Sequence, residues 1–304
     1  MDALRRSSVL RALLASLLCS VAAAQTPLPP TTIAKYETPS SRTTVTFGRR
    51  APQVGDQVEQ NVEVELSLRT LTRQGTKVLE RGEQRLTRRQ HRVITADRVE
   101  AGRTQAAYVK FLAADRQMDD EPKTAEPVVG KTYHCERDGE RLMIHTAKGE
   151  LPPLEEFRLV TPCMEMLGRA HPLADFFAER SVALDEKISL PEEVARELLG
   201  ADDQFGKVSR FEMKLVRLEE IDGRDCAVFD AEIEATGAGA SQMRLLVTGP
   251  LVLEVSTCRS ISAEFYGPIG MSEVQGGYGA RYQVDATGKF RVAVSSKYEQ
   301  ATAR

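Results

Sequence analysis

With 304 residues, of which 41% are hydrophobic, the chain is long enough to build a sizeable core in one large domain or two smaller ones. The absence of tryptophan excludes a carbohydrate-binding platform built on indole rings. A formal net charge of −3 gives the protein no general electrostatic attraction to nucleic acid or to anionic lipid.

The first 24 residues have the pattern of an export signal. Arg5, Arg6 and Arg11 precede a short apolar run from Ala12 to Leu18, and the small residues Ala22–Ala24 offer a cleavage site. The apolar run is too short to remain as a transmembrane helix, and no later run is long enough. We therefore expect an exported protein, periplasmic or secreted, with no transmembrane segment.

A lipid anchor at Cys19 is the alternative to a soluble exported form. Bacterial lipoprotein signals need a small residue immediately before the cysteine, whereas Leu18 stands there, which favours the soluble form. Residues 25–42 are rich in Pro, Thr and Ser and predict a flexible tether, and residues 299–304 predict a polar tail.

Periodicity predicts one β-rich domain over residues 43–298. Strand patterns occupy 43–147 and 207–298, and a helical segment lies between them at 152–200. The clearest N-terminal alternation places apolar residues at Val62, Val64, Leu66 and Leu68. The expected fold class is mainly β (α+β), with a large curved antiparallel sheet or half-barrel covered by the helical segment.

An arginine-rich run from Val78 to Thr95 predicts a long polar strand. Such a run is typical of a solvated face or a protected sheet edge, and an anion-binding stripe is the alternative. Its arginines are Arg81, Arg85, Arg88, Arg89 and Arg92.

A tight hairpin is predicted around Asp138–Gly139. Counting outward from this turn places His134 opposite Met143, with His145 diagonal to His134 on the same face. Two histidines without a third ligand make a weak metal site, so solvated histidines are favoured over a metal ion, and no cofactor is expected.

The helical segment holds two expected helices. Apolar residues at helical spacing run from Leu154 to Leu167, where Pro162 should bend or break the helix. A second helix is expected from Pro191 to Leu199, with Gly200 as its end.

The C-terminal third predicts an antiparallel meander of three strands with one buried face. Alternating runs contain Phe229 and Ile233 in the first strand and Phe265 in the third, and Phe211 lies on a strand before them. Gly249–Pro250 is interpreted as the turn between the second and third runs. A last hairpin is expected from Arg281 to Tyr298 around Thr287–Gly288.

Four cysteines follow the leader, in a compartment where disulfides form. Cys226 and Cys258 fall at opposite ends of the expected meander, which favours pairing Cys135 with Cys163 among three possible connectivities. No Cys-x-x-Cys motif supports a zinc ribbon or a thioredoxin-like site.

Arg259 breaks the apolar pattern of the third meander run. A bulge that turns it outward, or burial against a Glu, is the structural interpretation. The functional interpretation places its guanidinium in the concave face, where it binds a carboxylate or phosphate beside Phe211, Phe229, Ile233 and Phe265.

Three short segments resemble those of uncharacterised exported bacterial β-rich proteins. They are Val128–Tyr133, Pro172–Arg180 and Leu190–Gly200, and the resemblance spans roughly Val62 to Tyr298. That family implies no activity. A looser analogy, at the level of fold, is to periplasmic lipoprotein carriers, whose curved sheet is plugged by helices.

These patterns lead to three hypotheses of function. The first is a non-catalytic envelope protein that binds an apolar or amphipathic, lipid-like ligand between sheet and helices. The second is a structural module with a filled core that binds another envelope protein through its sheet edges or the arginine-rich strand. The third is a hydrolase, for which no catalytic motif was found and no catalytic residue is assigned.

Overall fold

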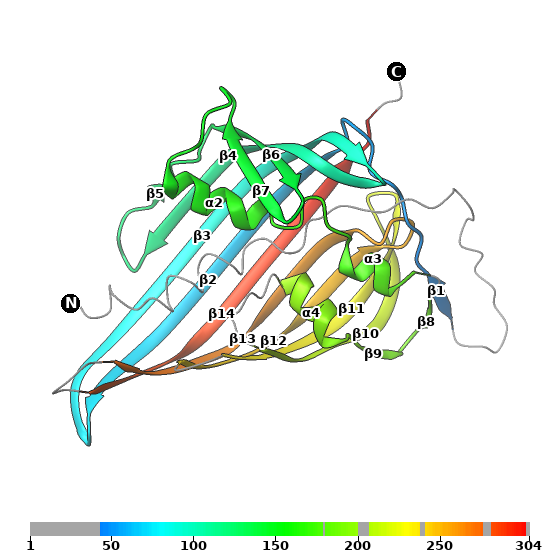
Figure 1. Cartoon of the computed structure of the whole chain (residues 1–304). Coiled ribbons are helices and arrows are strands. Elements are labelled where there is room, and N and C mark those ends of the chain that lie inside the picture. The colour runs from blue at the N-terminus through cyan, green and yellow to red at the C-terminus, as the bar shows by residue number, and fades with distance from the viewer. Residues whose placement is uncertain (1–42, 179, 200–206, 238–240, 276–280, 302–304) are drawn as a thin grey trace.

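The computed structural model describes residues 43–178, 180–199, 207–237, 241–275 and 281–301, and these form a large curved antiparallel sheet with helices on one face (Figure 1). The sheet has 12 strands, in the order β7-β6-β4-β3-β2-β14-β13-β12-β11-β10-β9, with β5 paired to β4. The mainly β fold class and the curved antiparallel sheet are thus confirmed. The expected leader, tether and Gly200 lie outside the described residues.

The strands of the sheet are β2 (Gln57–Gln74), β3 (Lys77–Glu100), β4 (Arg103–Met118), β5 (Thr124–Ala125), β6 (Thr132–Asp138), β7 (Arg141–Thr146), β9 (Lys187–Ser189), β10 (Lys207–Ile221), β11 (Arg224–Thr236), β12 (Ser241–Glu254), β13 (Ser260–Gln275) and β14 (Tyr282–Glu299). A separate pair joins β1 (Thr44–Thr46) to β8 (Ser181–Ala183). The C-terminal strand β14 pairs with β2, which joins the two β-rich parts of the chain into one sheet.

Three helices lie on the same face of the sheet, which we call the inner face (Figure 1). They are α2 (Leu154–Met164), α3 (Pro172–Phe176) and α4 (Glu192–Leu199). Val160, Leu173 and Leu198 bury apolar side chains in the same core cluster as the alternating strand residues. The sheet therefore buries one face under the helices, as the period-two pattern of its strands requires.

Pro162 lies inside α2 without ending it. It lies near the end of the helix, where it removes one N–H bond to the carbonyl four residues earlier, and Thr161 Oγ1 donates to the carbonyl oxygen of Phe157 at 2.8 Å. The helix continues to Met164.

The meander exists, but the expected turn at Gly249–Pro250 is wrong. β12 runs straight through both residues, and the chain turns at 255–259 instead. A Cβ atom on Gly249 would lie 1.8 Å from the carbonyl oxygen of Glu264 on β13. Glycine is needed there because two backbones approach closely, which is a second use of the residue besides turns.

The expected hairpin at Thr287–Gly288 is wrong for the same reason. β14 is one strand of 18 residues, and a Cβ on Gly288 would lie 1.8 Å from the carbonyl oxygen of Ser67 on β2. Gly267 on β13 is equally close, 2.0 Å, to the carbonyl oxygen of Leu246. The three glycines form a diagonal across the sheet. Each is displaced by two positions from the residue that pairs with the previous glycine, from Gly249 on β12 to Gly267 on β13 and to Gly288 on β14.

The arginine-rich strand is β3, and its position corrects the prediction of a sheet edge. It lies between β2 and β4, and its side chains alternate between solvent and the inner face. Arg88 and Arg92 are buried, while Arg81, Arg85 and Arg89 are exposed. Arg89 faces outward and pairs with Glu63 on β2. A partner protein therefore cannot contact Arg88 and Arg89 on the same face.

In the described part of the chain, no helix combines the length and the apolar character needed to cross a membrane.

Candidate functional site

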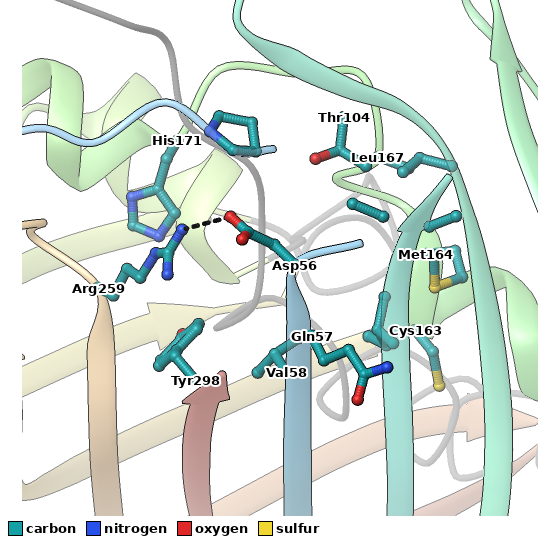
Figure 2. A pocket seen from close by; sticks show the side chains of 14 residues that line it. Asp56, Gln57, Val58, Thr104, Cys163, Met164, Leu167, His171, Arg259 and Tyr298 are labelled. Atoms are coloured by element: carbon teal, nitrogen blue, oxygen red, sulfur yellow. Dashed lines mark ion pairs between the residues drawn. The ribbon is translucent and has the colours of Figure 1, made fainter. Parts of the chain in front are cut away.

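A pocket of about 100 Å³ opens between the upper ends of the strands and the segment that joins α2 to α3 (Figure 2). One wall is apolar. Ile94 of β3 and Ala107 of β4 reach it from the sheet, and Met164 and Leu167 from the helical side. Ile94 and Ala107 both occupy inward positions in the alternation of their strands. The alternation that buries the core residues therefore also forms this apolar wall.

Arg259 stands at the polar end of the pocket. Its guanidinium lies 3.8 Å from Asp56 and 4.8 Å from the ring centre of Tyr298. Burial lowers the pKa of Arg259, since desolvation penalises the charged form. Arg259 belongs to the 255–259 turn, so it reaches the pocket from beyond the end of β12 and its position is not set by strand alternation. The expected bulge that turns Arg259 outward is therefore wrong, and its buried place beside Asp56 fits both burial against an acidic residue and the functional interpretation.

Asp56 holds this end of the pocket together. Its carboxylate accepts hydrogen bonds from the backbone N–H groups of Gln53 at 3.0 Å and Ala301 at 3.1 Å. It therefore joins the chain before β2 to the chain after β14, besides facing Arg259. Its charge partly balances the buried guanidinium.

His171 contributes a neutral imidazole. Its Nδ1 accepts the backbone N–H of Ala174 at 3.2 Å, so it caps α3, where Pro172 occupies the first turn. Burial lowers the pKa of His171 to about 4. The ring is neutral at physiological pH, and because Nδ1 accepts, the proton is on Nε2. A ring nitrogen of His171 lies beside Arg259 in Figure 2.

A thiol closes the opposite end of the pocket. Cys163, in the last turn of α2, lines it and accepts a hydrogen bond from Arg92 Nη1 at 2.6 Å. Arg92 is 1% exposed and also donates to Gln60 and Gln90. Next to it, Arg88 forms a buried ion pair with Glu126 at 2.8 Å. We call the group of Gln60, Arg88, Gln90, Arg92 and Glu126 the polar layer.

The structure does not bring the five residues expected to bind a ligand together. Only Arg259 lines the pocket. Phe211, Phe229, Ile233 and Phe265 belong to the main core cluster. Phe229 packs against Phe47 and Phe177, with ring centres 6.1 and 5.9 Å away. These apolar side chains fill the core and do not line the pocket.

The sequence patterns do not predict His171 or Asp56 as site residues. The His171–Pro172 pair carries a usable signal, because a polar side chain before a first-turn proline marks a helix start. Nothing local marks Asp56, whose partners are distant in the sequence.

The two histidines considered for a metal lie directly opposite each other. The loop of the hairpin is Gly139–Glu140, so the register pairs His134 with His145 and corrects the expected diagonal. His134 Nε2 lies 3.0 Å from Asp97. No group of three or more potential ligands that could hold a metal occurs among the residues that the structure describes.

Cys135 and Cys163 are both buried free thiols in this structure, as are Cys226 and Cys258, and the pairing of Cys135 with Cys163 stays a prediction. The sulfur of Cys163 contacts Arg92 and donates to the carbonyl oxygen of Leu159.

Comparisons with known proteins give no family. No model of a protein family matches the chain, and no curated protein matches it. Solved structures with some similarity include lipovitellin, in a study of its lipid–protein interactions, at 11% identity and a TM-score of 0.35; the match covers 83% of this chain and 26% of that one. The chain thus spans about a quarter of lipovitellin's length.

A LolA superfamily protein from Nitrosomonas europaea matches at 14% identity and a TM-score of 0.14, over 80% of this chain and 87% of that one. ExeD from Aeromonas hydrophila matches at 8% identity and a TM-score of 0.15, over 81% of this chain and 48% of that one. Similarities this low carry no argument about function, which must come from the residues themselves.

Proposed function

We propose that the protein is an exported, non-catalytic envelope protein that binds a small amphipathic ligand, with an anionic end, in the pocket beside Arg259. The observation that carries the proposal is the polarity of this pocket. Apolar side chains from β3, β4 and the end of α2 form one wall, and a buried guanidinium stands at the other end. A ligand with an apolar body and an anionic head has the same polarity.

The contacts of Arg259 suit a carboxylate or phosphate group. Asp56 lies 3.8 Å from the guanidinium, longer than a direct charge-assisted hydrogen bond, and its oxygens are also occupied by backbone N–H groups. A ligand anion within direct hydrogen-bond distance would lie closer to the guanidinium than Asp56 does, and the planar guanidinium suits a carboxylate or phosphate. The protonated Nε2 of His171 supplies a second, uncharged donor beside it.

The size of the pocket limits the ligand. A volume of about 100 Å³ is below the roughly 300–1,000 Å³ of pockets that enclose drug-sized molecules. It holds an anionic head and a few carbon atoms. A longer chain requires α2 to move away from the sheet.

Ligand binding is tested with the mature protein, purified without denaturation. Native mass spectrometry reveals any retained ligand, and thermal shifts are measured with short-chain and long-chain carboxylic acids and with their methyl esters. We expect the acids to raise the melting temperature and the uncharged esters to do so much less, because only the acids bind Arg259.

The matched variants are Arg259→Met in the pocket and Arg81→Met on the exposed part of β3. The first should abolish the shift and the second should leave it unchanged. If no acid shifts the wild-type protein and no ligand is retained, the proposal is wrong.

Export is a separate part of the proposal and rests on residues 1–24. Expression in a bacterial host followed by periplasmic extraction should give a protein whose N-terminus is Gln25, as read by intact mass. An uncleaved protein in the cytoplasmic fraction contradicts export without affecting the ligand proposal.

A further inference from the structure

We propose that Cys163 is a reactive thiol at the inner end of the pocket, oxidised there by small hydroperoxides, and that Cys135 then converts the oxidised sulfur to a disulfide. This inference does not depend on the ligand proposed for Arg259, which lies at the opposite end of the pocket. It depends on the position of Cys163, its guanidinium partner and the place of the second thiol.

Arg92 is the contact of Cys163 that favours the thiolate, whereas the carbonyl oxygen of Leu159 accepts from the protonated thiol. Arg92 Nη1 donates to the sulfur at 2.6 Å, and Arg92 is almost completely buried, so solvent screens this interaction little. The carboxylate of the polar layer, Glu126, contacts Arg88 and Gln90.

The other cysteines provide an internal contrast. Burial raises the pKa of Cys135 and of Cys258 to about 12, and it also raises the pKa of Cys226. Among the four cysteines of the described chain, the structure shows an arginine hydrogen bond only at Cys163. A buried thiol without such a partner is inert, whereas a thiolate is the nucleophile.

The pocket gives a reagent access to Cys163. Its volume of about 100 Å³ exceeds the roughly 30 Å³ that a water molecule occupies in the liquid. A hydroperoxide with a small organic group fits this space. A bulky thiol reagent does not.

Cys135 lies across the same helix–sheet interface. On β6, its inward neighbours are Tyr133, whose hydroxyl donates to Glu156 at 2.6 Å, and Arg137, whose Nε donates to the carbonyl oxygen of Leu167 at 2.8 Å. Cys135 lies between these two anchors, just as Cys163 lies between Glu156 and Leu167. The negative charge of Cys163 also contributes to the raised pKa of Cys135, which agrees with their closeness.

The chemistry balances in two steps. The thiolate of Cys163 attacks the terminal oxygen of the hydroperoxide, a sulfur–oxygen bond forms, the oxygen–oxygen bond breaks, and the alkoxide leaves and takes a proton as an alcohol. The sulfur is oxidised by two electrons to a sulfenic acid as the peroxide is reduced. The Cys135 sulfur then attacks Cys163, a disulfide forms, the sulfur–oxygen bond breaks, and the oxygen leaves with the Cys135 proton as water.

The primary test uses the wild-type mature chain, fully reduced and then freed of reductant. Alkylation by iodoacetamide is followed by peptide mass mapping across a range of pH. We expect Cys163 to react at neutral pH at least about tenfold faster than Cys226 and Cys258. Equal rates at all cysteines would overturn the reactive thiol, and this comparison needs no variant to fold.

Stoichiometric hydrogen peroxide provides the second test. Peptide mapping should show one disulfide between Cys135 and Cys163. In Cys135→Ser, Cys163 should instead stop at the sulfenic acid, read by intact mass as the gain of one oxygen atom that a reductant removes. If wild-type Cys163 stops at a sulfenic or sulfinic acid, the role of Cys135 is wrong.

Two further variants separate local chemistry from folding. Arg92→Met should move the pH profile of Cys163 alkylation to higher pH and slow it at neutral pH by about tenfold, as for a pKa raised by one unit. Cys258→Ser should change neither. If Arg92→Met leaves the pH profile of a folded protein unchanged, the guanidinium does not activate the thiol.

Discussion

The inner face of the sheet has two halves, and the side chains that fill them differ: one half is aromatic and the other is polar. Beside α3 it is filled by aromatic rings: Phe47 and Phe177 are only 4.7 Å apart between ring centres, and Phe229 stacks on Phe47 and packs tilted against Phe177. Below α2 the same face carries the polar layer, including two buried arginines. An aromatic half needs only complementary shape, whereas a polar half needs every charge and donor to find a partner.

This difference between the two halves determines where reactive groups lie in the molecule. Dispersion and area burial are non-directional, so the aromatic half stabilises the fold without leaving a reactive group. Hydrogen bonds fix Arg92 and Cys163 in one geometry, next to the pocket. The aromatic half therefore acts mainly as a scaffold, and the polar half holds the thiol on which reagents should act.

The largest effect is expected in the aromatic half. Phe229→Ala should lower the free energy of unfolding by about 4 kcal/mol, because it leaves a cavity between Phe47 and Phe177. Urea denaturation followed by circular dichroism measures it. The control is Val274→Ala on β13, whose side chain is exposed and whose change should stay within about 0.5 kcal/mol. Similar losses in the two variants would contradict the scaffold role.

The polar half should respond to lost pairing more than to lost volume. Glu126→Leu leaves Arg88 buried without its ion-pair partner and should cost about 3 kcal/mol. Adding Arg88→Met to that variant should recover more than half of the loss, because it removes the unpaired charge. The double-mutant cycle is measured by the same urea titration. If the stability losses of Glu126→Leu and Arg88→Met simply add, the two side chains do not depend on each other, and the polar half responds to lost volume as the aromatic half does.

The effect that is smallest near neutral pH, and that grows only as the pH falls, is a pH dependence at the polar end of the pocket. Burial lowers the pKa of His171 from 6.5 to about 4, so as pH falls the unfolded chain binds a proton before the folded chain does. The stability contributed by the neutral ring is full above about pH 6.5 and is lost toward pH 4, at about 1.4 kcal/mol per unit.

The matched variant for this prediction is His171→Asn, which keeps an acceptor to cap α3. The difference in unfolding free energy between wild type and variant should change over this window and be flat above it. Urea titrations at several pH values measure it. A constant difference would mean that His171 is protonated equally in the folded and unfolded chains.

Much of the fold was predictable because strand alternation depends on single-residue polarity. Phe229, Ile233 and Phe265 were placed on the buried face from that pattern alone, and the structure buries all three. Gly249 and Gly288 were misread because one local signal, a glycine between apolar runs, serves both turns and close backbone approaches. Only the neighbouring strand distinguishes these two uses.

The pocket was less predictable, because its polar groups meet across long sequence separations. Arg88 lies 38 positions from Glu126, and Asp56 lies 245 positions from Ala301. Without knowledge of these partners, a charged residue is predicted to face solvent. Arg259 was singled out only because it broke a pattern locally.

The diagonal of Gly249, Gly267 and Gly288 has a mechanical consequence for the pocket. At these three glycines the backbones of neighbouring strands are in direct contact, with no side chain between them. The sheet therefore cannot bend further along this diagonal, because main-chain atoms would collide. The sheet is thus a stiff wall of the pocket. A ligand larger than the pocket can therefore be accommodated only if α2 moves away from the sheet.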